Sequence, residues 1–209
     1  MKAGAPWTDN NYHFYKKHSY LLKPREFSLF SGPSGTAMVS YYHSQLPLGL
    51  NKEDAMTNQA TTTALNQVIA DISQLRVNVQ QYHWYMRGEQ FFKLHPLMDD
   101  YLAQLGTHLD EVAERLIIIG GAPLSTTHEF TAHTKLPDDK LTWGQEPLTQ
   151  MVAGLVRQFK VLRDDYAAAI AVTEDAHDLT TQDMLIEFKG ECEKNIWMLN
   201  AYLGKDATA

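Results

Sequence analysis

The chain has little of several features that would define a protein class. Among its 209 residues it holds one cysteine, Cys192. A single cysteine cannot form a disulfide within the chain, which fits a reducing cytoplasm, and its helical surroundings predict a small core-facing side chain. No apolar run approaches the roughly 20 residues that span a membrane, and the first residues lack the apolar core of a secretory signal. We therefore expect a cytoplasmic protein that does not contact a membrane.

Signals for nucleotide chemistry and for β-structure are missing as well. The sequence contains neither the G-x-x-x-x-G-K-[ST] loop nor the G-x-G-x-x-G loop that bind phosphates, and we expect no organic cofactor. No histidine adjoins Cys192, so nothing would activate this thiol as a nucleophile. The period-two alternation of strands does not occur, which leaves an all-α fold as the expectation.

Charge is unevenly spread over the chain, whose net charge is −7. Residues 1–50 carry five basic and two acidic residues, a net of +3, so the remainder holds −10. A basic arm on an acidic body is typical of a tail that binds a polyanion on a domain that handles cations. The candidate DNA-binding residues of the arm are Lys2, Lys16, Lys17, Lys23 and Arg25.

Three interpretations of the arm stay open. Aromatic residues lie among its basic ones, which favours phosphate contact with base stacking; they are Tyr12, Phe14, Tyr15 and Tyr20. A solvated tail without a ligand is the second interpretation. The third is an extra metal site formed by His13, His18 and His43.

The patterning divides the chain into three parts. Residues 1–51 are rich in Gly, Pro, Ser and Tyr and show no sustained period, which predicts a largely irregular N-terminal extension with a short helix near 12–20. Residues 52–205 carry helical periodicity, and 206–209 form a short tail. Leu65, Val68, Ile69, Ile72, Leu75 and Val79 illustrate the periodicity, with apolar side chains three or four residues apart.

Four long helices are expected in the periodic part. Pro96 predicts a kink or a late start in the second of them, Gly120 and Gly121 stop it, and Pro147 suits the first turn of the third. The long middle connection, 122–145, would cross between the ends of the bundle and hold one short extra helix. The pattern thus predicts a four-helix bundle with helices over residues 56–86, 90–119, 147–173 and 181–203.

The second helix carries a stripe of residues that can bind a metal. His95, Asp99, Asp110 and Glu114 follow one another at spacings of 4, 11 and 4. At about 100° per residue they fall within a sector of about 100°. Each taken alone is typical of a solvated or hydrogen-bonded surface residue. Together, nitrogen and carboxylate ligands on one stripe favour iron or another transition metal.

The spacing also indicates that two subunits share the site. Asp99 and Asp110 lie about 16 Å apart along the helix, so one helix cannot wrap both ligand pairs around one ion. Two antiparallel copies that cross near residue 105 could, with His95 and Asp99 of one opposite Asp110 and Glu114 of the other. Gly106 would permit close approach there. His83, near the end of the first helix, is a further candidate ligand.

These residues carry a resemblance to a known family. The stretch YHWYMRGEQFFKLHPLMDDYLAQLGTHLDEVAERLIIIGGAPL and the C-terminal run DMLIEFKGECEKNIWMLNAYLGK resemble the Dps family of bacteria, the DNA-protecting mini-ferritins of the ferritin-like superfamily. The resemblance covers about residues 52–205. It implies a ferroxidase centre in which His83, His95 and Asp99 of one subunit join Asp110 and Glu114 of its two-fold mate. All five positions hold the residue type that the family has.

The resemblance implies a function in iron storage. Fe²⁺ would be oxidised, with hydrogen peroxide as preferred oxidant, and stored as ferric mineral inside a hollow shell of twelve subunits, which protects DNA from oxidative damage. Acidic residues near the start of the last helix line an iron-entry pore in the family, and the candidates are Asp175, Asp178 and Asp183. The alternative is a nucleoid-associated protein that compacts DNA through its arm.

Two further features receive weaker interpretations. Trp84 follows candidate ligand His83 and is interpreted as a core or interface residue, with electron donation to the site as the functional alternative. Glu174 and His177 form one Glu-x-x-His pair, whereas an intrasubunit di-iron site of ordinary ferritins needs two, so we interpret this pair as coincidence.

Overall fold

The computed structural model describes residues 52–209, with side chains from residue 59 onwards. All predictions about the N-terminal extension lie outside these residues. They include the short helix near 12–20, the candidate DNA-binding residues (Lys2, Lys16, Lys17, Lys23 and Arg25) and the histidine site of His13, His18 and His43.

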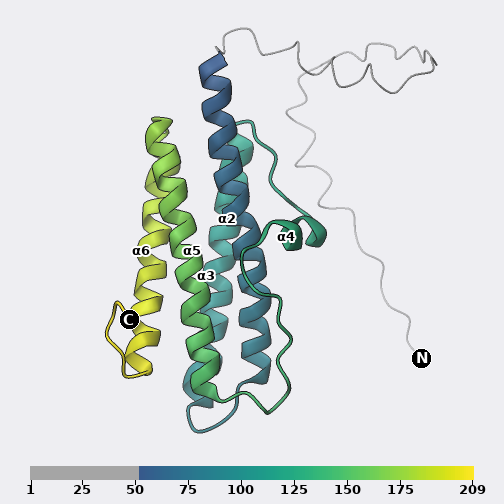
Figure 1. Cartoon of the computed structure of the whole chain (residues 1–209), viewed down its shortest axis with the longest axis vertical. Coiled ribbons are helices and arrows are strands. Elements are labelled where there is room, and N and C mark those ends of the chain that lie inside the picture. The colour runs from purple at the N-terminus through teal and green to yellow at the C-terminus, as the bar shows by residue number, and fades with distance from the viewer. Residues whose placement is uncertain (1–51) are drawn as a thin grey trace, which may run out of the picture. The chain divides into compact units, whose positions relative to one another are not determined.

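Residues 52–209 contain five helices and no strand, which confirms the predicted all-α class (Figure 1). Four are long and one is the short extra helix expected in the middle connection. In chain order they are α2 (Lys52–Tyr85), α3 (Phe91–Ile118), α4 (Thr127–His133), α5 (Leu148–Asp175) and α6 (Leu179–Tyr202). Helix α2 packs against α3, α4 and α5, and α5 packs against α6.

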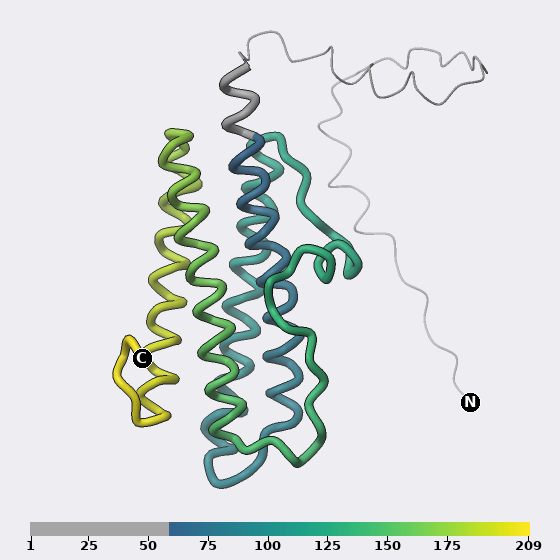
Figure 2. Tube along the Cα trace, viewed as in Figure 1, coloured from purple at the N-terminus to yellow at the C-terminus, as the bar shows by residue number. Residues whose placement is uncertain are grey.

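The four long helices run up and down along one another (Figure 2). Short turns join α2 to α3 and α5 to α6, so the members of each pair are antiparallel. The connection 119–147 returns from the end of α3 to the opposite end of the bundle, where α5 begins. This crossover is the one predicted from its length, and it carries α4 along the outside of α2.

The core is continuous across all four long helices. The stripe predicted on the first helix is fully buried, with Leu65, Val68, Ile69, Ile72, Leu75 and Val79 exposing at most 1% of their surface. Tyr166 and Phe159 of α5 are the largest fully buried side chains. Removing this much apolar surface from water is the main force that holds the bundle together.

Helix α3 passes through Pro96 without stopping. The helix begins at Phe91, five residues earlier, so the alternative of a late start is wrong. Because Pro96 lies near the start of the helix, the one backbone hydrogen bond that it removes is a bond to the first turn. The loss of helix stability is therefore limited. At the other end the helix stops where predicted, because Gly120 adopts φ +84°. Gly121 is also required there, because a side chain on it would collide with Leu116.

The starts of α5 and α6 differ from prediction by one or two residues. Pro147 is the residue before α5 and not its first helical residue. Helix α6 begins at Leu179, two residues early, because Asp178 caps it by accepting a hydrogen bond from the Thr181 amide. Asp178 also accepts a hydrogen bond from Arg115 of α3, at 2.8 Å.

A polar stripe on α2 fixes the path of the crossover connection. Its amide and carboxylate side chains recur every three or four residues beside the apolar stripe, and most of them bind backbone atoms. Asn78 donates to the carbonyl oxygen of Pro137 at 2.9 Å, and Gln81 donates to that of Asp139 at 2.9 Å. The stripe comprises Asn66, Gln67, Asp71, Gln74, Asn78 and Gln81.

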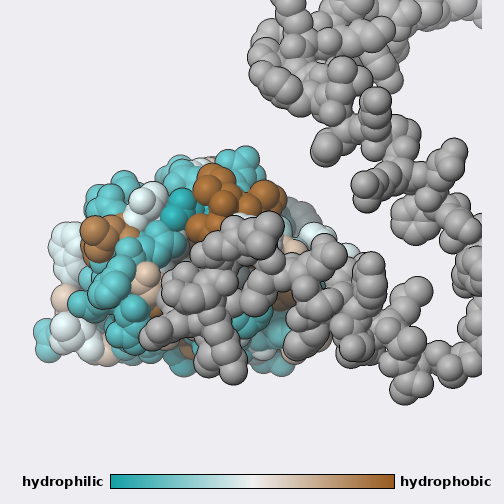
Figure 3. All heavy atoms as spheres, turned by 90° about the horizontal axis from the view of Figure 1, so that it is seen from above, coloured by the Kyte–Doolittle hydropathy of each residue, from teal (hydrophilic) through white to brown (hydrophobic). Residues whose placement is uncertain are grey.

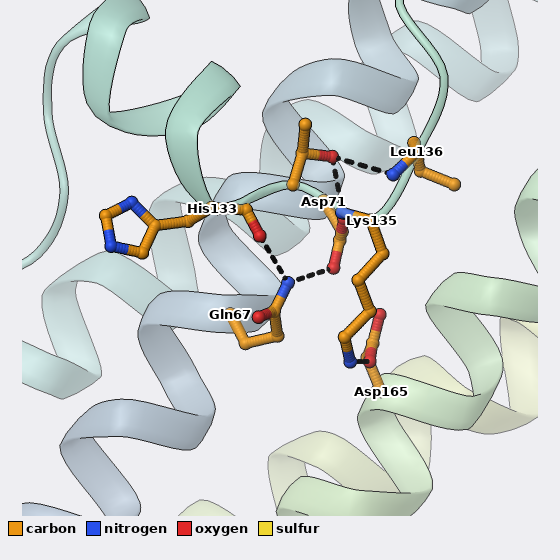
Figure 4. A network of polar contacts seen from close by, with 7 residues as sticks. Gln67, Asp71, His133, Lys135, Leu136 and Asp165 are labelled. Atoms are coloured by element: carbon orange, nitrogen blue, oxygen red, sulfur yellow. Dashed lines mark hydrogen bonds and ion pairs between the residues drawn. The ribbon is translucent and has the colours of Figure 1, made fainter.

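The centre of this stripe is an ionic cluster with two buried carboxylates and one exposed lysine (Figure 4). Asp71 of α2 is fully buried and accepts hydrogen bonds from Gln67 at 2.6 Å and from the Lys135 amide at 2.6 Å. Gln67 also donates to the carbonyl oxygen of His133 at the end of α4. The Lys135 ammonium pairs with Asp165 of α5, whose second carboxylate oxygen is buried without a hydrogen-bond partner. The cluster thereby ties the connection to two helices.

Apolar side chains are exposed at the end of the bundle where α3 ends and α6 begins. Ile117, Ile118 and Leu179 lie there, each more than half exposed. Figure 3 looks onto this end and shows separate groups of hydrophobic residues on it. Neighbouring apolar residues of this size are typical of a surface that another protein covers. Across residues 52–209, no helix is long and apolar enough to cross a membrane.

Candidate metal centre

Three of the five predicted ligands converge in one subunit. His83 lies near the C-terminal end of α2, and His95 and Asp99 lie on the first two turns of α3, across the short turn between the helices. One ligand atom from each lies within 4.8 Å of the other two. Two ligands about 2.1 Å from one ion are at most about 4.2 Å apart, so small side-chain rotations would complete the contact. Within the described residues no other three His, Cys, Asp or Glu side chains meet this closely.

Stacking and a backbone hydrogen bond orient the two imidazoles. The ring centroids of His83 and His95 are 3.8 Å apart, and Phe91 stacks on the other side of His95 at 4.6 Å. Nδ1 of His95 lies 3.0 Å from the carbonyl oxygen of His83. A carbonyl only accepts, so Nδ1 carries the proton and Nε2 is left with its lone pair for a metal.

His83 presents a nitrogen with no hydrogen bond. Its Nδ1 is buried and lies 3.4 Å from Oδ1 of Asp99, but their orientation does not form a hydrogen bond. A buried polar atom without a partner is unfavourable, whereas a cation between these two atoms would satisfy both. Asp99 remains exposed, so a ligand can reach the group from solvent.

The other two predicted ligands, Asp110 and Glu114, do not join this group. Both lie on α3 and are exposed, without an ion pair inside the described residues. Asp110 is eleven residues beyond Asp99, or about 16 Å along the axis. One subunit therefore offers half of a site at each end of the stripe. Three ligands of the two-His, one-carboxylate type leave coordination positions open, a set that suits Fe²⁺.

Comparison with known proteins identifies the family. A model of the ferritin-like domain matches residues 62–209. A DNA protection during starvation protein of Listeria monocytogenes is 42% identical over 145 residues, which cover 69% of this chain and 92% of that protein. The chain belongs to the Dps family.

Two solved Dps structures show the same fold. Dps from Listeria monocytogenes matches with a TM-score of 0.69 and 41% identity, over 71% of this chain and 96% of that one. Dps from Listeria innocua soaked with cobalt matches with a TM-score of 0.70 and 41% identity, over 71% and 95%. The four-helix bundle predicted from the helical pattern and the ferritin-like fold implied by the family resemblance are thus both confirmed.

The histidine in the Dps-like stretch H-L-D-E has a different task from the candidate ligands. His108 is buried between α3 and α6. Its Nε2 donates to Glu191 at 2.8 Å, and the Tyr166 hydroxyl lies 2.9 Å from its Nδ1. Burial lowers the pKa of His108 and thereby favours the neutral ring. Glu191 has the opposite effect on this pKa, but the effect of burial is larger. Both nitrogens are occupied, so His108 is a packing residue two positions before Asp110.

Trp84 lies outside the core of the subunit. Its side chain is 62% exposed beside His83, so the core half of the core-or-interface prediction is wrong. The interface half and the electron-donor alternative stay predictions. A large exposed aromatic next to a half-site is typical of a surface that a second subunit covers.

The three predicted pore residues have different surroundings. Asp175 at the end of α5 and Asp183 on α6 are exposed. Asp178 is partly buried and bonded to Arg115, Thr181 and the Thr181 backbone. Burial raises the pKa of Asp178, but these hydrogen bonds and the charge of Arg115 outweigh it and lower the pKa. Its charge is used inside the subunit, so Asp175 and Asp183 are the better pore candidates.

Two lesser predictions also have an outcome. His177 lies beyond the end of α5 with φ 55°, so Glu174 and His177 do not share a helical face, and they form no cluster with other metal-binding side chains of residues 52–209. Cys192 is buried and donates a hydrogen bond to the carbonyl oxygen of Phe159, as expected of a core residue. Burial raises the pKa of this thiol, which keeps it unreactive.

Sequence patterns missed one charged residue beside the site. Arg76 of α2 lies seven residues before His83, on the same helical face. Its guanidinium lies beside α3 between the two ligand pairs, with Nη2 3.8 Å from the position that a Cβ on Gly106 would take. The seven-residue spacing between Arg76 and candidate ligand His83 is the one sequence signal for this position. It is weak, because single arginines on helices are common.

Proposed function

We propose that this Dps-family protein is a ferroxidase. It oxidises Fe²⁺ at metal sites shared by two subunits, stores the product as ferric mineral in a hollow shell, and so protects DNA in the bacterial cytoplasm. The observation that carries the proposal is the convergence of His83, His95 and Asp99 in one subunit, while Asp110 and Glu114 face solvent on the same helix. The name DNA protection during starvation protein, borne by relatives, supports the protective role.

The ligand set suits iron oxidation. Antiparallel pairing of two α3 helices would add Asp110 and Glu114 of one subunit to the half-site of the other. Carboxylates are hard anionic ligands that stabilise Fe³⁺ more than Fe²⁺, which favours loss of an electron from iron. Two Fe²⁺ together supply both electrons that break the O–O bond of hydrogen peroxide, with two protons forming two waters. Paired electron transfer avoids release of a hydroxyl radical.

A closed assembly follows from the same reasoning. Each site needs ligands from two copies, and an isologous interface supplies two equivalent sites. The exposed Ile117, Ile118 and Leu179 at the end of the bundle support further contacts between subunits. A shell of twelve subunits is the arrangement that the family resemblance implies. Acidic side chains such as Asp175 and Asp183 would concentrate Fe²⁺ at its entry points.

Ferrous oxidation assays on ligand variants test the ferroxidase. Asp110→Asn, Glu114→Gln and His95→Ala each remove a charge or a ligand while leaving the apolar core intact. Each should slow Fe²⁺ oxidation by peroxide by at least about tenfold. Helix content by circular dichroism and assembly by sedimentation should stay as in the wild type. Full activity in all three would contradict the proposal.

Mixed assembly tests whether two subunits share each site. One parent carries His83→Ala and His95→Ala, and the other carries Asp110→Asn and Glu114→Gln. A mixed interface holds one intact site and one doubly defective site, so co-assembled protein should be more active than either parent. If mass analysis confirms co-assembly and activity stays at the parental level, the ligands come from one subunit.

DNA compaction through the basic arm is the second candidate function. It is supported by the net charge of +3 over residues 1–50 against −10 over the rest. An acidic body repels DNA, so binding would depend on the arm and fall steeply with salt. Ferrous oxidation and DNA binding are measured independently, and one protein can do both.

A further inference from the structure

Arg76 is a charged residue without a partner in the described part of the chain. Its Nε is buried and unbonded, and no carboxylate of residues 59–209 lies within ion-pair distance of its guanidinium. The side chain is only partly buried, so the group is not sealed in the core. Holding a guanidinium in such a place is unfavourable unless an anion reaches it. The subunit alone does not supply that anion.

The guanidinium lies midway along the candidate metal stripe. Its Nη2 lies 3.8 Å from the position that a Cβ on Gly106 would take. Gly106 follows Asp99 by seven residues and precedes Asp110 by four, and its direction on α3 falls inside the sector of the ligands. Arg76 and His83 share one face of α2. The positive charge is therefore held between the two half-sites.

Two-fold pairing brings carboxylates to this charge. In the antiparallel register that joins the half-sites, Asp99 of the partner subunit lies opposite Asp110. That position is one helical turn, about 6 Å, from Gly106 along α3. An arginine side chain spans that distance. Asp99 has two oxygens, so one can bind a metal while the other accepts a hydrogen bond from the guanidinium.

We propose that Arg76 is the counter-charge of the shared metal site, pairing with Asp99 of the partner subunit. This inference rests on the proposed two-subunit site. Asp99, Asp110 and Glu114 bring three negative charges together at each shared site. Before metal binds, Arg76 reduces the repulsion and holds the Asp99 carboxylate in place. After metal binds, the same positive charge opposes the cation. Arg76 is thus a positioning residue that favours metal-free assembly and weakens cation binding.

Arg76→Gln tests the two opposite effects. It removes the charge and keeps a side chain of similar polarity. In metal-free protein at low ionic strength, the variant should dissociate at a protein concentration about three- to tenfold higher than the wild type. It should bind Co²⁺ about three- to tenfold more tightly, and Co²⁺ should restore its assembly. Sedimentation velocity and cobalt titration give the two readouts.

Two controls separate charge from packing. Arg76→Lys keeps the charge and should behave as the wild type in both measurements. Arg157→Gln removes an exposed positive charge from α5 and should change neither. A purely structural role of Arg76 would weaken assembly and cobalt binding together. Cobalt binding that falls or stays unchanged in Arg76→Gln, relative to Arg157→Gln, overturns the inference.

A failure of the proposed metal site would look different. In that case His95→Ala protein with Arg76 intact would bind Co²⁺ as tightly as the wild type. If His95→Ala loses Co²⁺ while Arg76→Gln behaves as Arg157→Gln does, the site stands and only the role of Arg76 is wrong.

Discussion

Nδ1 of His95 donates a hydrogen bond to the carbonyl oxygen of His83 across the turn between α2 and α3. Through this bond, the backbone of one candidate ligand, His83, orients the imidazole ring of the other, His95. It also fixes which nitrogen of His95 carries the proton before any metal arrives.

Substitutions at His95 should separate these two tasks. In His95→Asn the side-chain amide can still donate to the His83 carbonyl oxygen, but no nitrogen lone pair remains for a metal. We expect stability within about 1 kcal/mol of the wild type and Co²⁺ affinity lower by at least about tenfold. His95→Leu should lose both the hydrogen bond and the metal. Thermal melting and cobalt titration check this, and Co²⁺ binding by His95→Asn at wild-type strength would contradict the assignment of Nε2 as ligand.

Asp178 should matter for stability and not for iron entry. Asp178→Ala removes the cap of α6 and the partner of Arg115, which should lower the free energy of unfolding by about 1–2 kcal/mol. Asp175→Ala removes an exposed carboxylate and should leave the melting temperature unchanged. Only the Asp175 variant should slow ferrous oxidation at low Fe²⁺. A slower oxidation in Asp178→Ala with an unchanged melting temperature would place Asp178 in the pore.

The same aspartate gives a pH dependence of known sign. The folded-state pKa of Asp178 is lower than its usual value of 3.8. Its stabilising contribution is therefore present above pH 4 and is lost as pH falls through the folded-state pKa. Wild-type and Asp178→Ala protein should approach each other in melting temperature below pH 4. A constant difference down to pH 3 would mean that the charge is not the source of the stability.

Asp165 should show the opposite pH dependence. Burial, and then the nearby Asp71 carboxylate, raise the pKa of Asp165 to about 6 against the opposing effect of Lys135, compared with 3.8 in its usual range. The folded state thus takes up a proton that the unfolded state does not, between about pH 6 and pH 4. This group should add up to about 3 kcal/mol of stability as pH falls through that window.

Asp165→Asn tests this pH dependence. The variant lacks the titrating group, so the advantage of the wild type over it should grow from pH 7 to pH 4.5 in thermal melts. Asp164→Asn is the matched control, because Asp164 is the next residue along α5 and its side chain is 66% exposed beside Arg163. A difference that stays flat with pH for Asp165→Asn would show that Lys135 keeps the carboxylate charged.

Deletion of residues 1–50 should separate DNA binding from iron chemistry. The arm lies outside the helical pattern, so assembly and ferrous oxidation should be unchanged. Each lost phosphate contact should flatten the slope of log affinity against log salt by about one unit. Gel shifts at several salt concentrations measure it. Unchanged DNA affinity after the deletion would assign the arm another role.

The parts that could be predicted are those fixed by geometry along one helix. Burial of the Leu65-to-Val79 stripe follows from three- and four-residue spacing, and the common direction of His95 and Asp99 follows from the helical rotation alone. The first residue of a helix is harder to predict, because several neighbouring side chains can cap the helix N-terminus. Asp178, Thr180 and Thr181 all suit the start of α6, and the choice depends on the Arg115 side chain that approaches from α3.

Contacts made by chain-distant segments could not be predicted. The polar stripe from Asn66 to Gln81 is visible in the sequence, but its partners depend on the path of the connection. The position of Arg76 over Gly106 depends on how α2 pairs with α3. Lys135 and Asp165 are thirty residues apart, and nothing in their spacing indicates an ion pair.

The way in which α2 holds the crossover has a consequence for how this protein can be altered. Asn66, Gln67, Asn78 and Gln81 contact main-chain atoms of the connection, which every residue type presents. Many residues of the connection can therefore be substituted, as long as the number of residues between successive anchors stays the same. The last anchors lie at Leu141, whose amide donates to Gln81, and at Gly144, whose carbonyl oxygen accepts a hydrogen bond from Arg87 just beyond α2. Insertion of a single residue between 134 and 139 would shift every later anchor of the connection away from its partner on or just beyond α2.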